Sequence, residues 1–507
     1  MFENQPKGLY ALALANTGER FGYYTMIAVF ALFLRANFGL DAGKAGLIYS
    51  SFLMLVYFLP VIGGVLADLF GYGRMVTTGI LVMFLGYVAL SVPLGGDNVA
   101  LWAMMGALLL ISVGTGLFKG NLQVMVGNLY DDPRYSDRRD AAFSIFYMAI
   151  NIGAMFAPTA AVKIMEWAQT SLGVSEADSY HFAFGVACLS LIVSIAIFYA
   201  FRSTFRHTEV SSRSKKADAK QAAAPDLPAG DTTRRVVALI LVFIVVIFFW
   251  MAFHQNGLTL TFFANEFTVK STSGLQSMAF DVWNLVMGII IVYAAFAAWE
   301  SKTARGRNIS LAVIAAAVAV LVVRYFALPA STAIDAPIFQ QFNPCFVVAL
   351  TPVSMAVFGW LARKGKEPSA PRKIALGMLV AAAAYLIMVL GSMGLPTPNE
   401  QAATGSAAAL VSPNWLISTY LVLTFGELLL SPMGISFVTK VAPPKLKGLM
   451  MGGWFASTAI GNFLVSVGGY LWGDLPLWQV WSVFIGVCLV SAAFMFIMMR
   501  RLEKVAR

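Results

Sequence analysis

The sequence predicts an all-α, polytopic membrane protein. Three observations carry this prediction: a low charge content, the length of the apolar runs, and the alternation of basic and acidic loops. Of the 507 residues, 59% are hydrophobic and only 12% are charged, and the mean hydropathy is +0.76. Soluble domains usually contain about a quarter charged residues. We therefore expect a lipid bilayer, rather than water, around most of this chain.

The apolar runs are long enough to cross a membrane. A spanning helix needs about 20 mostly apolar residues, because the hydrocarbon core is about 30 Å thick. Such runs predict about fourteen spans. They lie at roughly 8–36, 45–67, 75–93, 99–127, 141–165, 180–201, 235–263, 279–300, 309–328, 343–362, 373–394, 413–439, 448–473 and 477–499.

A polar segment divides these runs into two groups. Residues 203–234 contain Pro, Gly, Ser and many basic side chains, a composition typical of a linker. We expect a six-helix bundle over 1–202 and a second six-helix bundle over 235–507. The second bundle contains an inserted helical hairpin at about 279–328, between helices 7 and 8. Two such halves predict a central cavity.

The formal charge of +10 does not indicate nucleic-acid binding, because the Lys and Arg residues lie in short loops and form no continuous stripe. Alternate loops are basic, which predicts cytoplasmic N- and C-termini. The basic loops contain Arg74, Arg134, Arg138, Arg139, Lys302, Arg305, Arg307, Arg363, Lys364, Lys366, Arg372, Lys373, Lys440, Lys445 and Lys447. The opposite loops contain Asp97, Glu166, Glu176, Asp178, Glu400 and Asp474.

The sequence contains no pattern typical of an enzyme or of a metal site. Cys188, Cys345 and Cys488 lie within apolar runs, without a CxxC pair or a Cys/His ligand spacing. We interpret them as buried packing residues. No nucleophile with its base can be identified. We expect neither enzymatic activity nor a cofactor.

A charged face on the first helix is the main candidate for a functional site. Asn16, Glu19, Arg20, Tyr23 and Tyr24 recur at three- and four-residue steps, which places them on one face. An ionised side chain at mid-bilayer costs at least about 2.5 kcal/mol, so such residues are usually functional. Because Glu19 and Arg20 are adjacent, we expect each of them to find a partner elsewhere in the cavity.

Two other helices present charges that complement this face. Lys119 lies on the fourth helix, and Glu427 lies on the helix that includes residues 413–439. This arrangement suits a zwitterion: Arg20 and Lys119 would bind a carboxylate, while Glu427 and Asn343 would bind an ammonium group. The alternative is structural ion pairs, which seldom gain net stability over apolar packing.

Proton carriage has two candidates from the residues alone. Glu19 beside Arg20 and Lys119 can exchange a proton as substrate binding changes its surroundings. His254 lies inside the seventh span, where it is either a packed neutral side chain or a proton relay. Tyr57, Trp250 and Trp454 either line side-chain pockets or pack within the bundle.

Several motifs resemble the proton-coupled oligopeptide transporter family, which has the major facilitator fold. The likeness covers nearly the whole chain. The motifs are NTGERFGYY, VYFLPVIGGVLADLFGYGR, GTGLFKGN, DRRDAAFSIFYMAINIGAMFAP, FNPCFVVALTP, GELLLSPMG and LKGLMMGGWFASTAIGN.

The resemblance implies a symporter that imports di- and tripeptides by alternating access, with protons as the coupling ion. It also implies a monomer in a bacterial inner membrane. The peptide-cavity positions that it implies are Arg20, Tyr23, Tyr24, Tyr57, Lys119, Asn151, Asn343, Glu427, Ser431 and Trp454.

The chain departs from the family pattern at Asn16, where a Glu is usual, at Ile27, where many bacterial members have Arg, and at His254, where Glu is usual. In the family, the Arg at the position of Ile27 and the Glu at the position of His254 normally form an ion pair. Because both are absent here, neither leaves an unpaired charge behind. We expect proton coupling to pass through Glu19, Glu427 and His254. The alternative is a related transporter of a modified peptide, an anion or another small organic solute, or one with altered or absent proton coupling.

The inserted hairpin is also unusual, because bacterial members commonly place theirs between the two bundles. No paired ionisable groups can be identified inside it. We therefore expect an accessory or interface role for it.

Overall fold

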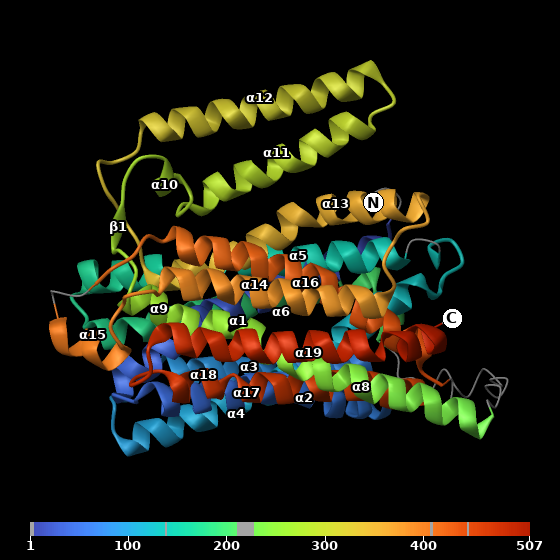
Figure 1. Ribbon diagram of the computed structural model, residues 1–507, viewed down its shortest axis with the longest axis horizontal. Helices are drawn as coiled ribbons and strands as arrows, with labels where there is room; N and C mark the ends of the chain where they lie inside the picture. The colour runs from blue at the N-terminus through green and yellow to red at the C-terminus, as the bar shows by residue number, and fades with distance from the viewer. Residues whose placement is uncertain (1–4, 137–138, 210–227, 406–408, 444–445, 507) are drawn as a thin grey trace.

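The computed structural model describes residues 5–136, 139–209, 228–405, 409–443 and 446–506. Fourteen helices within these ranges are long and apolar enough to cross a membrane, which confirms the predicted spans. The long helices run side by side along the molecule, and both termini lie towards the same end (Figure 1). Arg138, Lys445 and linker residues 210–227, which entered the charge prediction, lie outside the described residues.

The N-terminal half contains six long helices, which are well delimited by local signals. Asp41 and Asp97 accept hydrogen bonds from the first turns of the second and fourth helices, and Ser175 does so for the sixth. These are common N-cap residues. The helices are α1 (Lys7–Phe38), α2 (Ala42–Phe70), α3 (Tyr72–Ser91), α4 (Asn98–Asn128), α5 (Arg139–Leu172) and α6 (Glu176–Ala200).

The C-terminal half contains two interrupted spans. The seventh span is divided into α8 (Ala229–Phe253), the short 3-10 turn η5 (His254–Gly257) and α9 (Thr259–Glu266). The helix thus begins six residues before the predicted 235. Another span is divided into α17 (Lys447–Leu464) and α18 (Ser466–Leu471). The remaining helices of this half are α13 (Phe342–Arg363), α14 (Ala370–Gly391), α15 (Pro398–Thr404), α16 (Asn414–Val441) and α19 (Leu477–Ala506).

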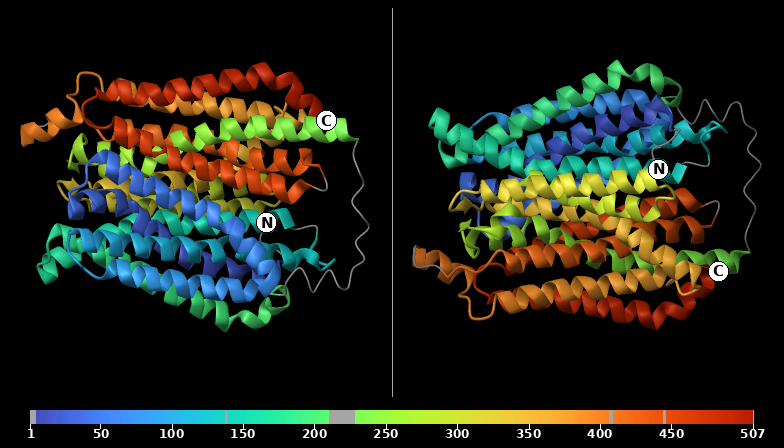
Figure 2. Two further views of the ribbon diagram at one scale, coloured as in Figure 1. Left: turned by 90° about the horizontal axis from the view of Figure 1, so that it is seen from below. Right: turned by 90° about the horizontal axis from the view of Figure 1, so that it is seen from above.

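The inserted hairpin consists of α11 (Val282–Glu300) and α12 (Ala304–Phe326). Its two ends are drawn together where β1 (Ser271–Thr272) pairs antiparallel with β2 (Thr332–Ala333). The short helix α10 (Leu275–Met278) precedes it. In the right-hand view of Figure 2, the hairpin lies along the line between the helices of the two halves. α11 packs against both α5 and α13, and α12 is the outermost helix in Figure 1.

The expectation that the hairpin has no paired ionisable groups is wrong. Arg324, in the last turn of α12, lies 2.5 Å from Asp281, which caps α11, and 2.5 Å from Asn284. The hairpin brings residues from its two ends together, although they are more than forty positions apart in sequence. Because of this separation, the Arg324–Asp281 pair could not be predicted from the spacing of residues within one helix.

Small residues allow helices of the N-terminal half to approach closely. A Cβ atom at Gly63 of α2 would lie 2.1 Å from the carbonyl oxygen of Gly116 on α4. A Cβ atom at Gly79 of α3 would lie 2.7 Å from the carbonyl oxygen of Gly114. Glycines at helix contacts are typical of membrane proteins, because packing rather than the hydrophobic effect holds the helices together.

We expect Gly63→Ala to destabilise the protein by about 1–3 kcal/mol, because backbone atoms of α2 and α4 must separate. The neighbouring Gly64 has open space around its would-be Cβ, so Gly64→Ala is the matched control. Thermal unfolding of the two purified variants in the same detergent checks the prediction. Equal unfolding temperatures would contradict the close approach of α2 and α4.

Candidate functional site

The charged residues on α1 pair with each other, which corrects the expectation that they have separate partners. The guanidinium of Arg20 donates from Nε and Nη2 to both carboxylate oxygens of Glu19, each at 2.5 Å. Both residues are buried, at 2% and 1% exposure. The long Arg side chain folds back, and its planar fork matches the carboxylate although the residues are adjacent. Its guanidinium carbon also lies 4.6 Å from the ring centre of Tyr23.

Lys119 of α4 is the cation that stays without an anionic partner. Within the part of the chain that the structure describes, no carboxylate pairs with its Nζ. The Nζ instead lies 4.0 Å from the ring centre of Tyr57 on α2, a cation–π contact. An ammonium group satisfied by one ring face retains capacity for an anion.

Glu427 of α16 is held by residues from both halves. Asn343 of α13, which we expect to bind an ammonium group together with Glu427, donates to its Oε2 at 2.9 Å. The hydroxyl of Tyr147, on α5, donates to its Oε1 at 3.3 Å. Asn151, one turn further along α5, donates to the carbonyl of Tyr147 at 3.0 Å. The carboxylate therefore lies at the boundary between the halves.

The sequence analysis missed Tyr147 as a site residue. The four-residue step to the predicted Asn151 places the two on one face of α5, and that step was the available signal. The distance between Tyr147 and Glu427 in sequence, 280 positions, conceals their contact.

His254 belongs to an aromatic cluster that links the two halves. Its ring stacks on Trp250 with centres 5.1 Å apart, and lies 6.0 Å from the ring centre of Tyr57. Its Nδ1 forms a 2.5 Å hydrogen bond with Oδ1 of Asn462 on α17. Asn462 is fully buried, and the sequence analysis did not select it. Lys119 and His254 thus both lie close to the ring of Tyr57.

Of the other predicted residues, Tyr23 and Tyr24 lie beside the charged pair of α1, whereas Trp454 lies apart from it. Tyr23 and Tyr24 meet edge to face with ring centres 5.2 Å apart beside the Arg20 pair. Ser431 is half-buried on α16. Trp454 is 3% exposed, and its ring lies against Gly434 and beside Phe243. It packs between α8 and α16, and no contact joins it to the charged residues within the described chain.

Two departures from the family pattern are buried in α1. Asn16 is 2% exposed, and its Nδ2 has no hydrogen-bond partner within the described residues. Ile27 is 6% exposed and belongs to the apolar core. The three cysteines are buried free thiols, as predicted.

A large cavity lies at the end of the molecule away from the termini. Its volume is about 1120 Å³, and its walls come from the ends of α1, α2, α9, α15 and α18. Arg35 of α1 forms an ion pair with Glu266 of α9 at its wall. The indole of Trp472 donates to the same Glu266 at 3.1 Å. Burial lowers the pKa of Lys270, a further lining residue in the loop after α9.

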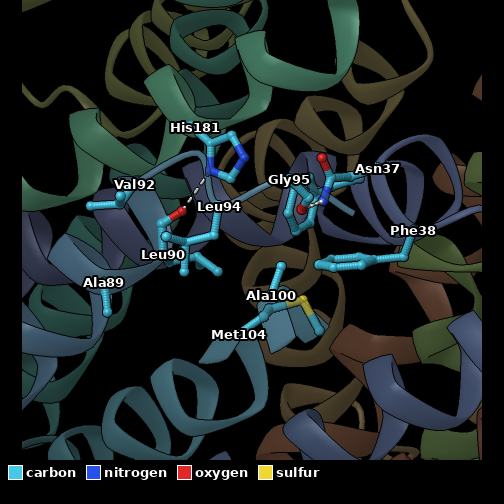
Figure 3. A pocket seen from close by; sticks show the side chains of 11 residues that line it. Asn37, Phe38, Ala89, Leu90, Val92, Leu94, Gly95, Ala100, Met104 and His181 are labelled. Carbon is cyan, nitrogen blue, oxygen red and sulfur yellow. Dashed lines mark hydrogen bonds between the residues drawn. The ribbon is translucent and has the colours of Figure 1, made fainter. Parts of the chain in front are cut away.

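Figure 3 shows a much smaller pocket of about 20 Å³ at the ends of α1, α3 and α6. The Nδ1 of His181 forms a 2.8 Å hydrogen bond with the carbonyl oxygen of Leu90 there, and Asn37 donates to the carbonyl of Gly95 at 2.9 Å. The volume suffices for about one water molecule. This pocket is too small for an organic substrate.

The described chain contains fourteen helices that could cross a membrane, in two halves that share a polar centre. This arrangement is typical of an integral membrane transporter. The POT family, PTR2, matches residues 74–224 and 327–471. The chain belongs to this family, as its motifs indicated.

Relatives and solved structures agree with this assignment. The chain is 30% identical to the uncharacterized transporter YclF of Bacillus subtilis, over 94% of this chain and 90% of that protein. It is 28% identical to dipeptide and tripeptide permease A of Citrobacter koseri, over 93% of this chain and 85% of that protein. A crystal structure of a mutant of the peptide transporter POT in complex with alafosfalin has a TM-score of 0.73 and 25% identity. The structural match covers 100% of this chain and 96% of the chain in that crystal structure. The predicted major facilitator fold is confirmed.

We expect Glu19→Ala to destabilise the protein by about 3–5 kcal/mol, because it leaves the guanidinium of Arg20 buried without a partner. The double variant Glu19→Ala/Arg20→Met should regain much of that stability, since it removes both charges. Thermal unfolding in detergent measures both. A double variant less stable than the single one would contradict the pairing of these two residues.

Proposed function

We propose that the chain is a proton-coupled symporter that imports di- and tripeptides by alternating access. The observation that carries the proposal is the separation of two groups in the described chain. Lys119 is a half-buried cation of the N-terminal half with which no described carboxylate pairs, and Glu427 is a carboxylate fixed at the boundary with the other half. A short peptide carries both complementary charges at its ends. Names of relatives support peptides as the substrate class, since one is a dipeptide and tripeptide permease.

The peptide carboxylate is expected to bind Lys119 first. Arg20 is already neutralised by Glu19, whereas Lys119 has donors available. The incoming carboxylate then competes with Glu19 for the fork of Arg20, since a bidentate guanidinium pair is strong and directional. At the other end, Glu427 accepts hydrogen bonds from the peptide ammonium in addition to those from Asn343 and Tyr147. Lost hydration is replaced by charge-assisted bonds at both ends.

Proton coupling follows from the same competition. When a peptide carboxylate takes over Arg20, Glu19 loses its cation, and burial then favours its protonated form. The proton travels with the peptide, and its release restores the Glu19–Arg20 pair. Glu427 is the second proposed proton carrier. His254 can act as a relay, or it can serve as a neutral group fixed by Asn462. The coupling needs no cofactor beyond the proton.

Alternating access requires contacts that close one end of the molecule and can open again. The Arg35–Glu266 pair joins α1 to α9, and therefore joins the two halves, at the end away from the termini. With cytoplasmic termini, as the basic loops predict, this pair closes the outer end. The protein would then act in a bacterial inner membrane, as a monomer.

The alternative substrate is a modified peptide, an anion or another small organic solute. Asn16, Ile27 and His254 favour it, because three family charges are absent. A carboxylate-only substrate would need Arg20 and Lys119 but not Glu427. Dialanine, N-acetyl-dialanine and a simple carboxylate compared as competitors distinguish these substrate classes.

Purified protein in liposomes is expected to take up labelled dialanine when the outside is more acidic. Glu427→Gln should weaken dialanine affinity by about tenfold, because a charge-assisted bond to the ammonium contributes about 1.5–3 kcal/mol. Binding of N-acetyl-dialanine should change little. The exposed Glu166 provides the control Glu166→Gln. Uptake that ignores both the pH gradient and Glu19→Gln would overturn the proposal.

His254→Ala separates the two roles open to that residue. A relay role predicts a shifted pH profile of uptake with little change in dialanine binding. Uptake measured between pH 5 and 8, with binding measured in parallel, checks this. An unchanged pH profile would assign His254 to packing against Trp250 and Tyr57.

A further inference from the structure

Pro352 interrupts the hydrogen bonding of α13. A proline inside a helix has no N–H to donate to the residue four positions earlier, which is Val348 in α13. Val348 is 4% exposed, so water does not readily replace the missing donor. In a membrane protein such a carbonyl must be satisfied by another group.

Tyr293 of the inserted hairpin supplies that group. Its hydroxyl donates to the carbonyl oxygen of Val348 at 3.1 Å. The same hydroxyl lies 3.9 Å from Sδ of Met148 on α5. Tyr293 therefore lies where α5, α11 and α13 meet. Met148 directly follows Tyr147, which bonds Glu427.

Prolines free backbone carbonyls in four of the spanning helices, and Tyr293 bonds the one that belongs to Val348. Three other prolines inside spanning helices free a carbonyl by the same rule. No side-chain hydrogen bond to those three carbonyls occurs among the residues that the structure describes. The prolines are Pro60, Pro158 and Pro432, and the freed carbonyls belong to Val56, Ala154 and Leu428.

The hairpin holds Tyr293 on a fixed base. Trp283 of α11 meets Phe156 of α5 edge to face, with ring centres 5.3 Å apart. Val282 packs with Met155 of α5 and Cys345 of α13 in a small apolar cluster. These contacts connect α11 to both halves along the line seen in Figure 2.

Pro352, a position at which helices usually kink, divides α13 into two segments with different surroundings. Before it lies Asn343, which bonds Glu427. Beyond it the helix is more exposed, with Met355 at 67% and Trp360 at 49%. A change in the kink angle therefore moves the second segment relative to the substrate site.

We propose that the inserted hairpin supports the kink of α13 through Tyr293, and that Tyr293 is a positioning residue that sets the rate of the conformational change in transport. This inference rests on the proposed transport function. It gives the hairpin a role that no motif in the sequence assigns. Within the described residues, no hydrogen bond joins Tyr293 to Arg20, Lys119 or Glu427. Its removal should therefore alter turnover rather than substrate binding.

Tyr293→Phe removes only the hydroxyl. We expect it to lower the maximal rate of dialanine uptake by about tenfold, the effect of about 1.4 kcal/mol. The concentration for half-maximal uptake should stay within about twofold. Tyr325→Phe is the control, because the Tyr325 hydroxyl on α12 makes no hydrogen bond within the described residues. A large change in half-maximal concentration with an unchanged maximal rate would overturn the proposal.

Pro352→Ala provides the decisive cross-test, because alanine restores an N–H for the Val348 carbonyl. In that background Tyr293→Phe should change the maximal rate by less than about twofold. The unsubstituted protein, the two single variants and the double variant form a cycle. Their thermal unfolding, which does not depend on any substrate, should show the same non-additive effect on stability. Additive effects in the unfolding measurement would contradict the role of Tyr293. If dialanine is not transported at all, the proposed function fails, and the unfolding cycle still decides the role of Tyr293.

Discussion

The cost of an unpaired charge away from water is the constraint on which the rest of this structure depends. An ionised side chain in a membrane interior must be paired, hydrogen-bonded or open to an aqueous cavity. Arg20 meets this requirement through Glu19, and Glu427 meets it through Asn343 and Tyr147. Among the described residues, Lys119 has the ring of Tyr57 as its partner and no carboxylate. Within the described chain, Lys119 is therefore a cation of the site that can still bind an anion.

The same constraint connects the halves of the molecule. Glu427 takes one hydrogen bond from each half, and Arg35 reaches across to Glu266 at the end away from the termini. The same cost applies to backbone groups, and the Val348 carbonyl that Pro352 leaves without a donor accepts a hydrogen bond from Tyr293. Several polar groups that would be costly alone thus find partners at the boundary between the halves or at the inserted hairpin. Relative movement of the halves must exchange these partners.

Much of the fold could be predicted, because span length and hydropathy are local properties. All fourteen spans were predicted from apolar runs, and the breaks at His254 and Val465 were not. Near these breaks, His254 and Asn462 join the two interrupted spans by a hydrogen bond, a contact that periodicity cannot indicate.

The sequence indicated which residues belong to the candidate site better than it indicated which of their side chains contact one another. Asn343 and Glu427 could be selected because both carry polar groups in apolar spans, and the structure places their side chains in contact, whereas their binding of an ammonium group stays a prediction. The Glu19–Arg20 pair did not, because it depends on the conformation of one long side chain. Tyr147 and Tyr293 escaped notice, since single tyrosines in apolar helices are usually packing residues. Their roles appear only when residues distant in sequence are placed together.

The central claim is that a bound peptide displaces Glu19 from Arg20 and so draws in a proton. The most direct measurement is calorimetric titration of the purified protein with dialanine near pH 7, in buffers with different ionisation enthalpies. The account predicts uptake of about one proton per bound peptide, and clearly less uptake in Glu19→Gln. Binding without any proton uptake in the unsubstituted protein would contradict it.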